Sequence, residues 1–144
     1  MLDRDVVAAQ AARLLEQLPR PVNAAVVFDI DDTLIDGKDG SSIPAVIALY
    51  RRTRQLGYTT FIVTNRVAGY GSYTDRQLAS VGVTGYVSSY FRSPGENDFW
   101  GAKRSARKHI AERGYTTVMS IGDKPWDIGE YGGYGVIIPA ASGP

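Results

Sequence analysis

The chain has 144 residues, an ordinary share of apolar residues and a formal net charge of +1 at neutral pH. This length favours one domain with its own core, and the near-neutral charge gives no argument for binding nucleic acid or a membrane surface. The absence of cysteine excludes disulfides and thiolate metal sites. No apolar run is long enough to cross a bilayer and the N-terminal residues lack the pattern of a signal peptide, so the expected location is the cytoplasm.

Helix-like and strand-like patterns alternate along the chain. The first helix is predicted over 4–18, with Asp3 as its N-cap. Thr74 and Gln77 have the spacing of a capping box at the start of a later helix. The remaining predicted elements are helices at 43–56, 74–81 and 98–113, and strands at 24–30, 59–64, 86–91, 116–121 and 135–139.

Apolar strands that alternate with helices indicate a parallel sheet covered on both faces. We therefore predict an α/β fold with a doubly wound, Rossmann-like, parallel sheet of five strands and helices on both faces. The expected organisation is a single domain over 1–144, with an N-terminal helix in 1–20, a core over 24–139 and a flexible tail at 140–144.

Polar residues gather where the predicted strands end. The stretch VVFDIDDTLIDG at 26–37 carries several acids directly after the first strand. In a parallel sheet the carboxyl ends of the strands lie along one edge, where ligands bind. The residues predicted to meet there are Asp29 and Asp31 from the first strand, Thr64, Asn65 and Arg66 from the second, Asp123 and Asp127 after the fourth, and Lys103 from the helix before it.

These residue types indicate metal-assisted phosphoryl transfer. Grouped carboxylates repel one another unless a cation neutralises them, and oxygen donors without histidine or cysteine favour Mg²⁺. A carboxylate beside Mg²⁺ can attack phosphorus and form an aspartyl-phosphate. Asp31 could protonate the leaving oxygen, while Lys103, Thr64 and the backbone N–H groups of the 30–33 loop neutralise the phosphoryl charge.

Four motifs resemble those of the haloacid dehalogenase (HAD) superfamily. FDIDDTL resembles the first motif, Asp-x-Asp-x-Thr after an apolar strand, FIVTNR resembles the second and IGDKPWD the fourth. Lys103 stands 20 positions before Asp123, which fits the third motif. The order AKRSARKHIAERGYTTVMSIGDKPWD resembles the branch that holds bacterial class B and plant acid phosphatases. The resemblance covers roughly residues 24–139.

The resemblance implies a role for each matched residue. In the first motif, Asp29 matches the nucleophile and a Mg²⁺ ligand, Asp31 matches the general acid/base with its carbonyl on Mg²⁺, and Thr33 matches the residue that steadies this phosphate-binding loop. Thr64 matches the phosphate-binding hydroxyl and Lys103 the phosphate-binding lysine. Asp123 matches an acidic Mg²⁺ ligand, and Asp127 matches the second acid of that motif, which holds a metal water or the lysine. Asn65 and Arg66 are candidates for substrate contact, with the alternative that they are merely surface residues of a loop.

Several of these residues also have a possible role that is purely structural. Lys103 lies among other basic residues and has the alternative of a solvated helix lysine, and Asp127 that of an acid at a helix N-terminus. Trp126 either packs under its loop or lines the pocket.

The intervals between the motifs leave no room for a cap domain. Only 30 residues separate Thr33 from Thr64, and one helix and one strand use nearly all of them. Capless members of the superfamily act on large substrates or borrow a lid from a neighbouring subunit, so an open site and a homodimer are both consistent with the sequence. No membrane partner is expected.

The expected function is a Mg²⁺-dependent phosphomonoester hydrolase that acts through an aspartyl-phosphate on a small molecule, a nucleic-acid end or a phosphoprotein. One alternative is a phosphatase of nucleotides or polynucleotide ends, because FRSPGENDFWGAK resembles a region of polynucleotide 3′-phosphatase domains. A further alternative is a catalytically inert HAD-like module that binds metal or phosphate.

Overall fold

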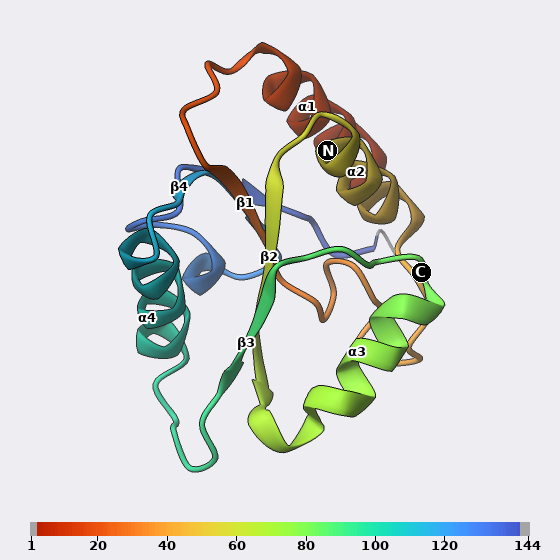
Figure 1. Ribbon diagram of the computed structural model, residues 1–144. Helices are drawn as coiled ribbons and strands as arrows, with labels where there is room; N and C mark the ends of the chain where they lie inside the picture. The colour runs from red at the N-terminus through yellow and green to blue at the C-terminus, as the bar shows by residue number, and fades with distance from the viewer. Residues whose placement is uncertain (1–2, 142–144) are drawn as a thin grey trace.

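The computed structural model describes residues 3–141, in which helices and strands alternate as predicted (Figure 1). In chain order the elements are α1 (Arg4–Gln17), β1 (Ala24–Phe28), α2 (Pro44–Gln55), β2 (Thr59–Val67), the 3₁₀ turn η1 (Ala68–Tyr70), α3 (Gly71–Ser80), β3 (Ser88–Arg92), α4 (Phe99–Glu112), β4 (Thr116–Gly122), the 3₁₀ turn η2 (Pro125–Asp127) and β5 (Tyr134–Ile137). Asp3 caps α1 as predicted, because its side chain accepts from the N–H of Val6 at 2.9 Å. Among residues 3–141 no helix is long and apolar enough to cross a membrane.

The five strands form one parallel sheet in the order β3-β2-β1-β4-β5. The predicted α/β fold with a five-stranded parallel sheet is therefore confirmed. β1 is the central strand, so its carboxyl end lies between those of β2 and β4. In open parallel sheets this is where ligands bind.

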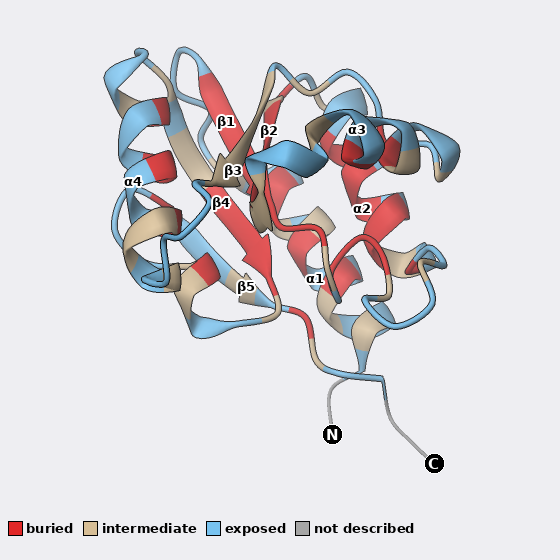
Figure 2. Cartoon of the chain, turned by 90° about the horizontal axis from the view of Figure 1, so that it is seen from below, coloured by how far each residue is buried: buried red, intermediate tan, exposed pale blue. Residues whose placement is uncertain are grey.

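β1 is buried along its whole length because helices cover both faces of the sheet (Figure 2). Val26 and Phe28 belong to the core cluster that also contains the buried side chains of α1, α2 and α3. Ala25 and Val27 belong to the cluster on the other face, together with Ala106 of α4. This alternation follows from the strand period of two and explains why the β1 sequence is apolar throughout.

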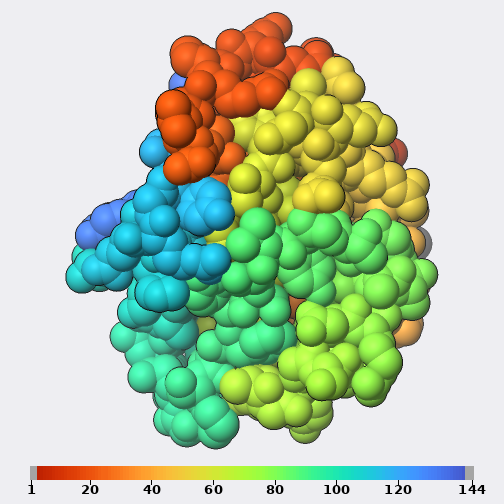
Figure 3. Space-filling view, in the orientation of Figure 1, coloured from red at the N-terminus to blue at the C-terminus, as the bar shows by residue number. Residues whose placement is uncertain are grey.

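The connections between the strands contain only helices, turns and loops. A loop and α2 join β1 to β2, and no inserted domain occurs anywhere in residues 3–141. In the space-filling view these residues form one continuous body (Figure 3). The capless organisation expected from the motif spacing agrees with this arrangement.

The predicted capping box at Thr74 is wrong. The helix begins earlier, at Gly71, and its N-cap residue Tyr70 makes no side-chain cap bond. Thr74 is instead buried within α3, where its hydroxyl accepts a hydrogen bond from Arg66. β2 continues three residues beyond its predicted end, to Val67, and so places Arg66 in a strand.

Candidate active site

The loop after β1 fixes the position of Asp29. The backbone N–H of Asp29 donates to the carbonyl of Ile121 at 2.9 Å and so continues the ladder with β4. The chain then turns sharply, because the carbonyl of Ile30 accepts from the N–H groups of residues 33–35. This turn returns Thr33 to Asp29, and its hydroxyl donates to Asp29 Oδ2 at 3.1 Å. Thr33 thus steadies the carboxylate that begins the loop.

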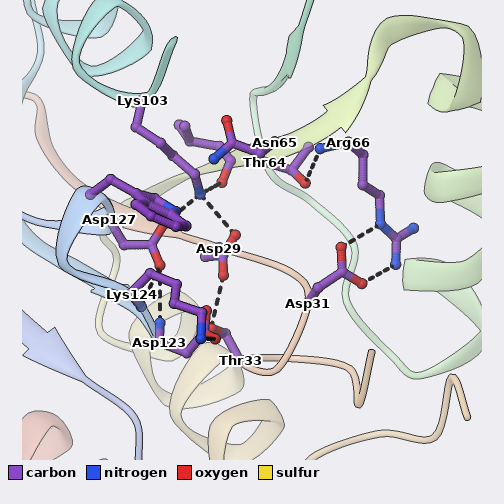
Figure 4. Close-up of polar contacts among 12 residues, drawn as sticks. Asp29, Asp31, Thr33, Thr64, Asn65, Arg66, Lys103, Asp123, Lys124 and Asp127 are labelled. Atoms are coloured by element: carbon purple, nitrogen blue, oxygen red, sulfur yellow. Dashed lines mark hydrogen bonds and ion pairs between the residues drawn. The ribbon is translucent and has the colours of Figure 1, made fainter. Parts of the chain in front are cut away.

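Lys103 reaches from α4 to the ends of the strands and is buried, with 2% of its side chain exposed. Its ammonium group lies 2.8 Å from Asp29 Oδ1 and 2.5 Å from Asp127 Oδ1 (Figure 4). It also donates to the carbonyl of Val63 at 2.7 Å. The alternative of a solvated surface lysine does not describe this residue.

Asp29 and Asp127, the two acids that pair with Lys103, form a cluster with Asp123. Oxygen atoms of Asp29, Asp123 and Asp127 lie within 4.8 Å of one another. Asp127 is held by the backbone as well, since its Oδ2 accepts from the N–H groups of Asp123 and Lys124, each at 3.0 Å. The three carboxylates and the ammonium of Lys103 together carry a charge of −2, which one divalent cation would balance. The donor set of carboxylate oxygens fits Mg²⁺.

Burial dominates the pKa values of the three carboxylates. It raises the pKa of Asp29 from 3.8 to about 6, although the nearby ammonium of Lys103 opposes the change. Burial also raises the pKa of Asp127 and of Asp123. For Lys103, burial acts to lower the pKa, but Asp29 and Asp127 outweigh it and the pKa is raised. The carboxylates therefore bind protons more readily than ordinary acids do, and a cation in the cluster would displace those protons.

Asp31 lies outside the three-acid cluster. Both of its carboxylate oxygens accept from Arg66, from Nε at 2.9 Å and from Nη2 at 2.8 Å (Figure 4). The third nitrogen of Arg66 donates to Thr74 at 3.1 Å and to Gln77 at 2.7 Å, both on α3. The hydrogen bonds with Asp31 raise the pKa of Arg66, and the guanidinium therefore stays cationic. Arg66 therefore ties the carboxylate of Asp31 to α3.

A cavity of about 300 Å³ opens over these groups. Two aromatic side chains, Phe99 and Trp126, form part of its lining and pack edge to face with ring centroids 5.6 Å apart. The buried Oδ1 of Asn65 has no hydrogen-bond partner in the described part of the chain and is available to a ligand. The lining residues are Asp29, Asp31, Asp32, Thr64, Asn65, Arg66, Phe99, Asp123, Lys124 and Trp126.

The structure brings the residues predicted from the sequence to one edge of the sheet. Six of them line the cavity, namely Asp29, Asp31, Thr64, Asn65, Arg66 and Asp123. Thr33, Lys103 and Asp127 are buried beside it and contact Asp29 or one another. Thr64 is nearly fully buried, and its hydroxyl accepts from the N–H of Arg66 at 3.0 Å.

Sequence reasoning missed Phe99 as part of the cavity, because a residue at the first turn of a basic helix carries no signal of its own. Of the two alternatives for Trp126, the structure shows that it lines the cavity, where it also packs against Phe99 of α4.

The parallel sheet, the Asp-x-Asp-x-Thr loop after β1 and the buried lysine beside two carboxylates define a HAD-type α/β protein. The sequence model of the HAD superfamily, subfamily IIIB (Acid phosphatase), matches residues 35–139. The chain belongs to this family, and the predicted membership of the HAD superfamily, in its acid phosphatase branch, is confirmed. The matched residues begin after Asp29, Asp31 and Thr33, so the family match does not extend to these three.

Solved structures with the same fold include two kinds of protein. The class C acid phosphatase from Bacillus anthracis with tungstate bound has a TM-score of 0.68 and 16% identity, over 94% of this chain and 77% of that one. A chain of the Pnkp1/Rnl/Hen1 complex has a TM-score of 0.65 and 18% identity, over 83% of this chain and 47% of that one.

A chain of the Pnkp1/Rnl/Hen1 RNA repair complex has a TM-score of 0.66 and 18% identity, over 86% of this chain and 45% of that one. This protein thus spans about half the length of those complex subunits. At such identities the likeness concerns the fold alone. Comparison with curated protein sequences finds no significant match.

Proposed function

We propose that this protein is a Mg²⁺-dependent phosphomonoester hydrolase that works through an aspartyl-phosphate on Asp29. The observation that carries the proposal is the buried Asp29, paired with Lys103 and grouped with Asp123 and Asp127 beside an open cavity. In this proposal Asp29, Asp123 and Asp127 hold the metal, together with the carbonyl of Asp31. Bound there, Mg²⁺ would neutralise phosphoryl charge as the phosphorus–oxygen bonds change.

The chemistry proceeds in two displacements. A carboxylate oxygen of Asp29 attacks phosphorus, the ester P–O bond breaks, and Asp31 gives its proton to the leaving oxygen. Asp31 then takes a proton from water, whose oxygen attacks the same phosphorus. The bond between phosphorus and Asp29 breaks, and inorganic phosphate leaves with both carboxyl groups restored.

The other polar residues act on the phosphoryl group or on Asp31. The ammonium of Lys103, the hydroxyl of Thr64 and the side-chain amide of Asn65 can bind its oxygens. Asp31 can serve as the proton donor only after it gives up a bond to Arg66 and takes up a proton from solvent, because both of its oxygens accept from the guanidinium. Arg66 freed in this way can contact the substrate. The structure thus suggests that substrate binding and rotation of Asp31 are linked.

The open cavity with an aromatic wall favours a second candidate within the same chemistry, a phosphatase of nucleic-acid ends. Phe99 and Trp126 stand beside the proposed phosphoryl site and offer a surface on which a base can stack. The fold likeness to chains of an RNA repair complex is consistent with such a substrate. Small phosphomonoesters and phosphoproteins are the competing substrates.

The test is hydrolysis of a panel of substrates with Mg²⁺ and with EDTA. The panel contains an aryl phosphate, nucleoside 3′- and 5′-monophosphates, 3′- and 5′-phosphorylated oligonucleotides and a phosphopeptide. We expect phosphate release that requires Mg²⁺ and falls roughly a thousandfold or more in Asp29→Asn. The matched control Asp36→Asn changes an acid of the same loop that does not line the cavity, and should keep its activity.

The result that would refute the proposal is a folded protein that binds Mg²⁺ and hydrolyses no member of the panel. That result would favour the inert module that binds metal or phosphate. Activity that persists in EDTA would refute the metal dependence alone.

A further inference from the structure

The connection between β4 and β5 is irregular although it carries much of the candidate site. Parallel strands are usually joined through an α-helix. Here residues 123–133 contain only the three-residue turn η2. Asp123, Trp126 and Asp127 all lie in this connection, at the cavity or in the acid cluster. A segment without helical hydrogen bonds needs other partners to hold its carbonyl groups.

Arg107 supplies those partners. It lies on α4 and is buried, with only 4% of its surface exposed. Its guanidinium donates to three carbonyls of the connection: to Glu130 from Nε at 2.9 Å, to Trp126 from Nη1 at 2.9 Å and to Ile128 from Nη2 at 3.3 Å. Burial lowers the pKa of Arg107. Within residues 3–141 it forms no ion pair with a carboxylate, so main-chain dipoles stabilise its charge.

The connection is shaped to wrap around this side chain. A Cβ atom at Gly132 would lie 3.3 Å from Arg107 Cδ and 2.8 Å from Ser120 Oγ. The hydroxyl of Ser120 donates to the carbonyl of Gly132 at 2.9 Å and fixes that close approach. Gly129 has a φ of +121°, which a residue with a Cβ rarely adopts. Glycine at these positions lets the carbonyls turn inward toward the guanidinium.

Lys103 and Arg107 lie one turn apart on the same face of α4 and hold Asp127 from two sides. Lys103 pairs with the side chain of Asp127, and Arg107 binds the carbonyls of the residues before and after it, Trp126 and Ile128. We propose that Arg107 is a positioning residue that sets the β4–β5 connection, and with it Asp123 and Asp127, in the geometry that binds the divalent cation. The link to the cation rests on the proposed function, whereas the effect on the connection does not.

The test compares Arg107→Met and Arg107→Lys with the wild-type chain. Arg104→Met is the matched control, because Arg104 is exposed, lies on the same helix and contacts the same connection through side chains and not through its carbonyls: it pairs with Glu130 at 3.0 Å and lies over the ring of Tyr131. The readouts are Mg²⁺ affinity by calorimetry and hydrogen exchange of the amides in residues 123–133. Thermal unfolding is recorded for each variant.

We expect Arg107→Met to weaken Mg²⁺ binding by about 10- to 100-fold and to raise exchange in residues 123–133 while the sheet stays protected. Arg107→Lys should fall between this variant and the wild type, because an ammonium cannot offer the planar fork of donors. Arg104→Met should match the wild type in both readouts.

Two results would overturn the inference. One is a folded Arg107→Met with wild-type Mg²⁺ affinity and wild-type exchange in residues 123–133. The other is a uniform loss of protection over the whole chain with unchanged affinity, which would make Arg107 a purely structural residue. If Arg107→Met does not fold, Arg107→Lys decides, because wild-type behaviour in both readouts contradicts the inference. If the wild-type chain binds no Mg²⁺, the proposed function fails, and the exchange data alone decide on Arg107.

Discussion

Replacing the proposed nucleophile by its neutral isostere should stabilise the metal-free protein at neutral pH. Asp29 is buried, and burial outweighs the attraction of Lys103, so that its pKa rises from 3.8 to about 6. The folded protein therefore holds the proton of Asp29 more tightly than the unfolded chain does. The stability that this group contributes is present below about pH 4 and is lost as the pH rises through 6.

The difference between 3.8 and about 6 corresponds to roughly 3 kcal/mol at pH 7. The side-chain amide of the Asp29→Asn variant has no charge to bury. In EDTA at pH 7, the free energy of unfolding of this variant should therefore exceed that of the wild type by most of this amount. For a chain of this length the gain corresponds to a melting temperature higher by roughly 10 °C. Near pH 4 the two proteins should unfold at similar temperatures, because Asp29 is then largely protonated.

The assay is urea and thermal unfolding of both proteins in EDTA at pH 4 and pH 7, followed by addition of Mg²⁺ at pH 7. Mg²⁺ should stabilise the wild type more than Asp29→Asn, which has lost a ligand. Asp5→Asn is the control, because Asp5 is an exposed acid in α1. A metal-free Asp29→Asn that is less stable than the wild type at pH 7 would refute the reasoning, since the ion pair with Lys103 would then outweigh the cost of burial.

Three further predictions concern activity and binding. Arg66→Met should lower kcat/KM by roughly 10- to 100-fold, because the substrate loses the guanidinium that Asp31 releases, and Gln77→Leu, which removes one partner of Arg66, should give a smaller fall in steady-state kinetics. Asp29 must lose its proton to bind the metal, so the dissociation constant for Mg²⁺ should rise about tenfold for each pH unit below 6 and level off above it. Calorimetry measures this constant, and a flat profile between pH 5 and 7 would contradict the prediction. Phe99→Ala should raise KM roughly tenfold for aryl and nucleotide substrates and leave alkyl phosphates unaffected, and equal effects on both kinds would exclude stacking at this wall.

Much of the fold followed from local patterns in the sequence. The apolar runs of β1 and β4 are long enough to be buried on both faces, and a sheet that places them side by side brings Asp29 and Asp123 together. The resemblance to the third HAD motif identifies Lys103, 20 positions before Asp123, but the sequence does not show that this lysine is buried. The start of α3 could not be predicted, because the hydroxyl of Thr74 serves Arg66 and not the helix end.

The role of Arg107 was hidden for a physical reason. Lys103, Ala106, Arg107 and Ile110 have the spacing of a buried helical stripe, and all four are buried. Two of these residues are cations, which are normally placed in solvent, and other basic residues of α4 are exposed. The partners of Arg107 are backbone carbonyls of a connection without regular structure, and no pattern of residue types marks such acceptors. Likewise, the pairing of Asp31 with Arg66 depends on rotamers that the sequence does not specify.

The most direct test of the central claim is to trap the phosphoryl group on the enzyme. The wild-type chain is mixed with a phosphomonoester and Mg²⁺, quenched in acid within milliseconds and digested for mass spectrometry. The account predicts one added phosphoryl group on the peptide that contains Asp29, and none in Asp29→Asn or in EDTA. Turnover without any phosphorylated peptide, or with the phosphoryl group on another residue, would contradict the assignment of Asp29 as the nucleophile.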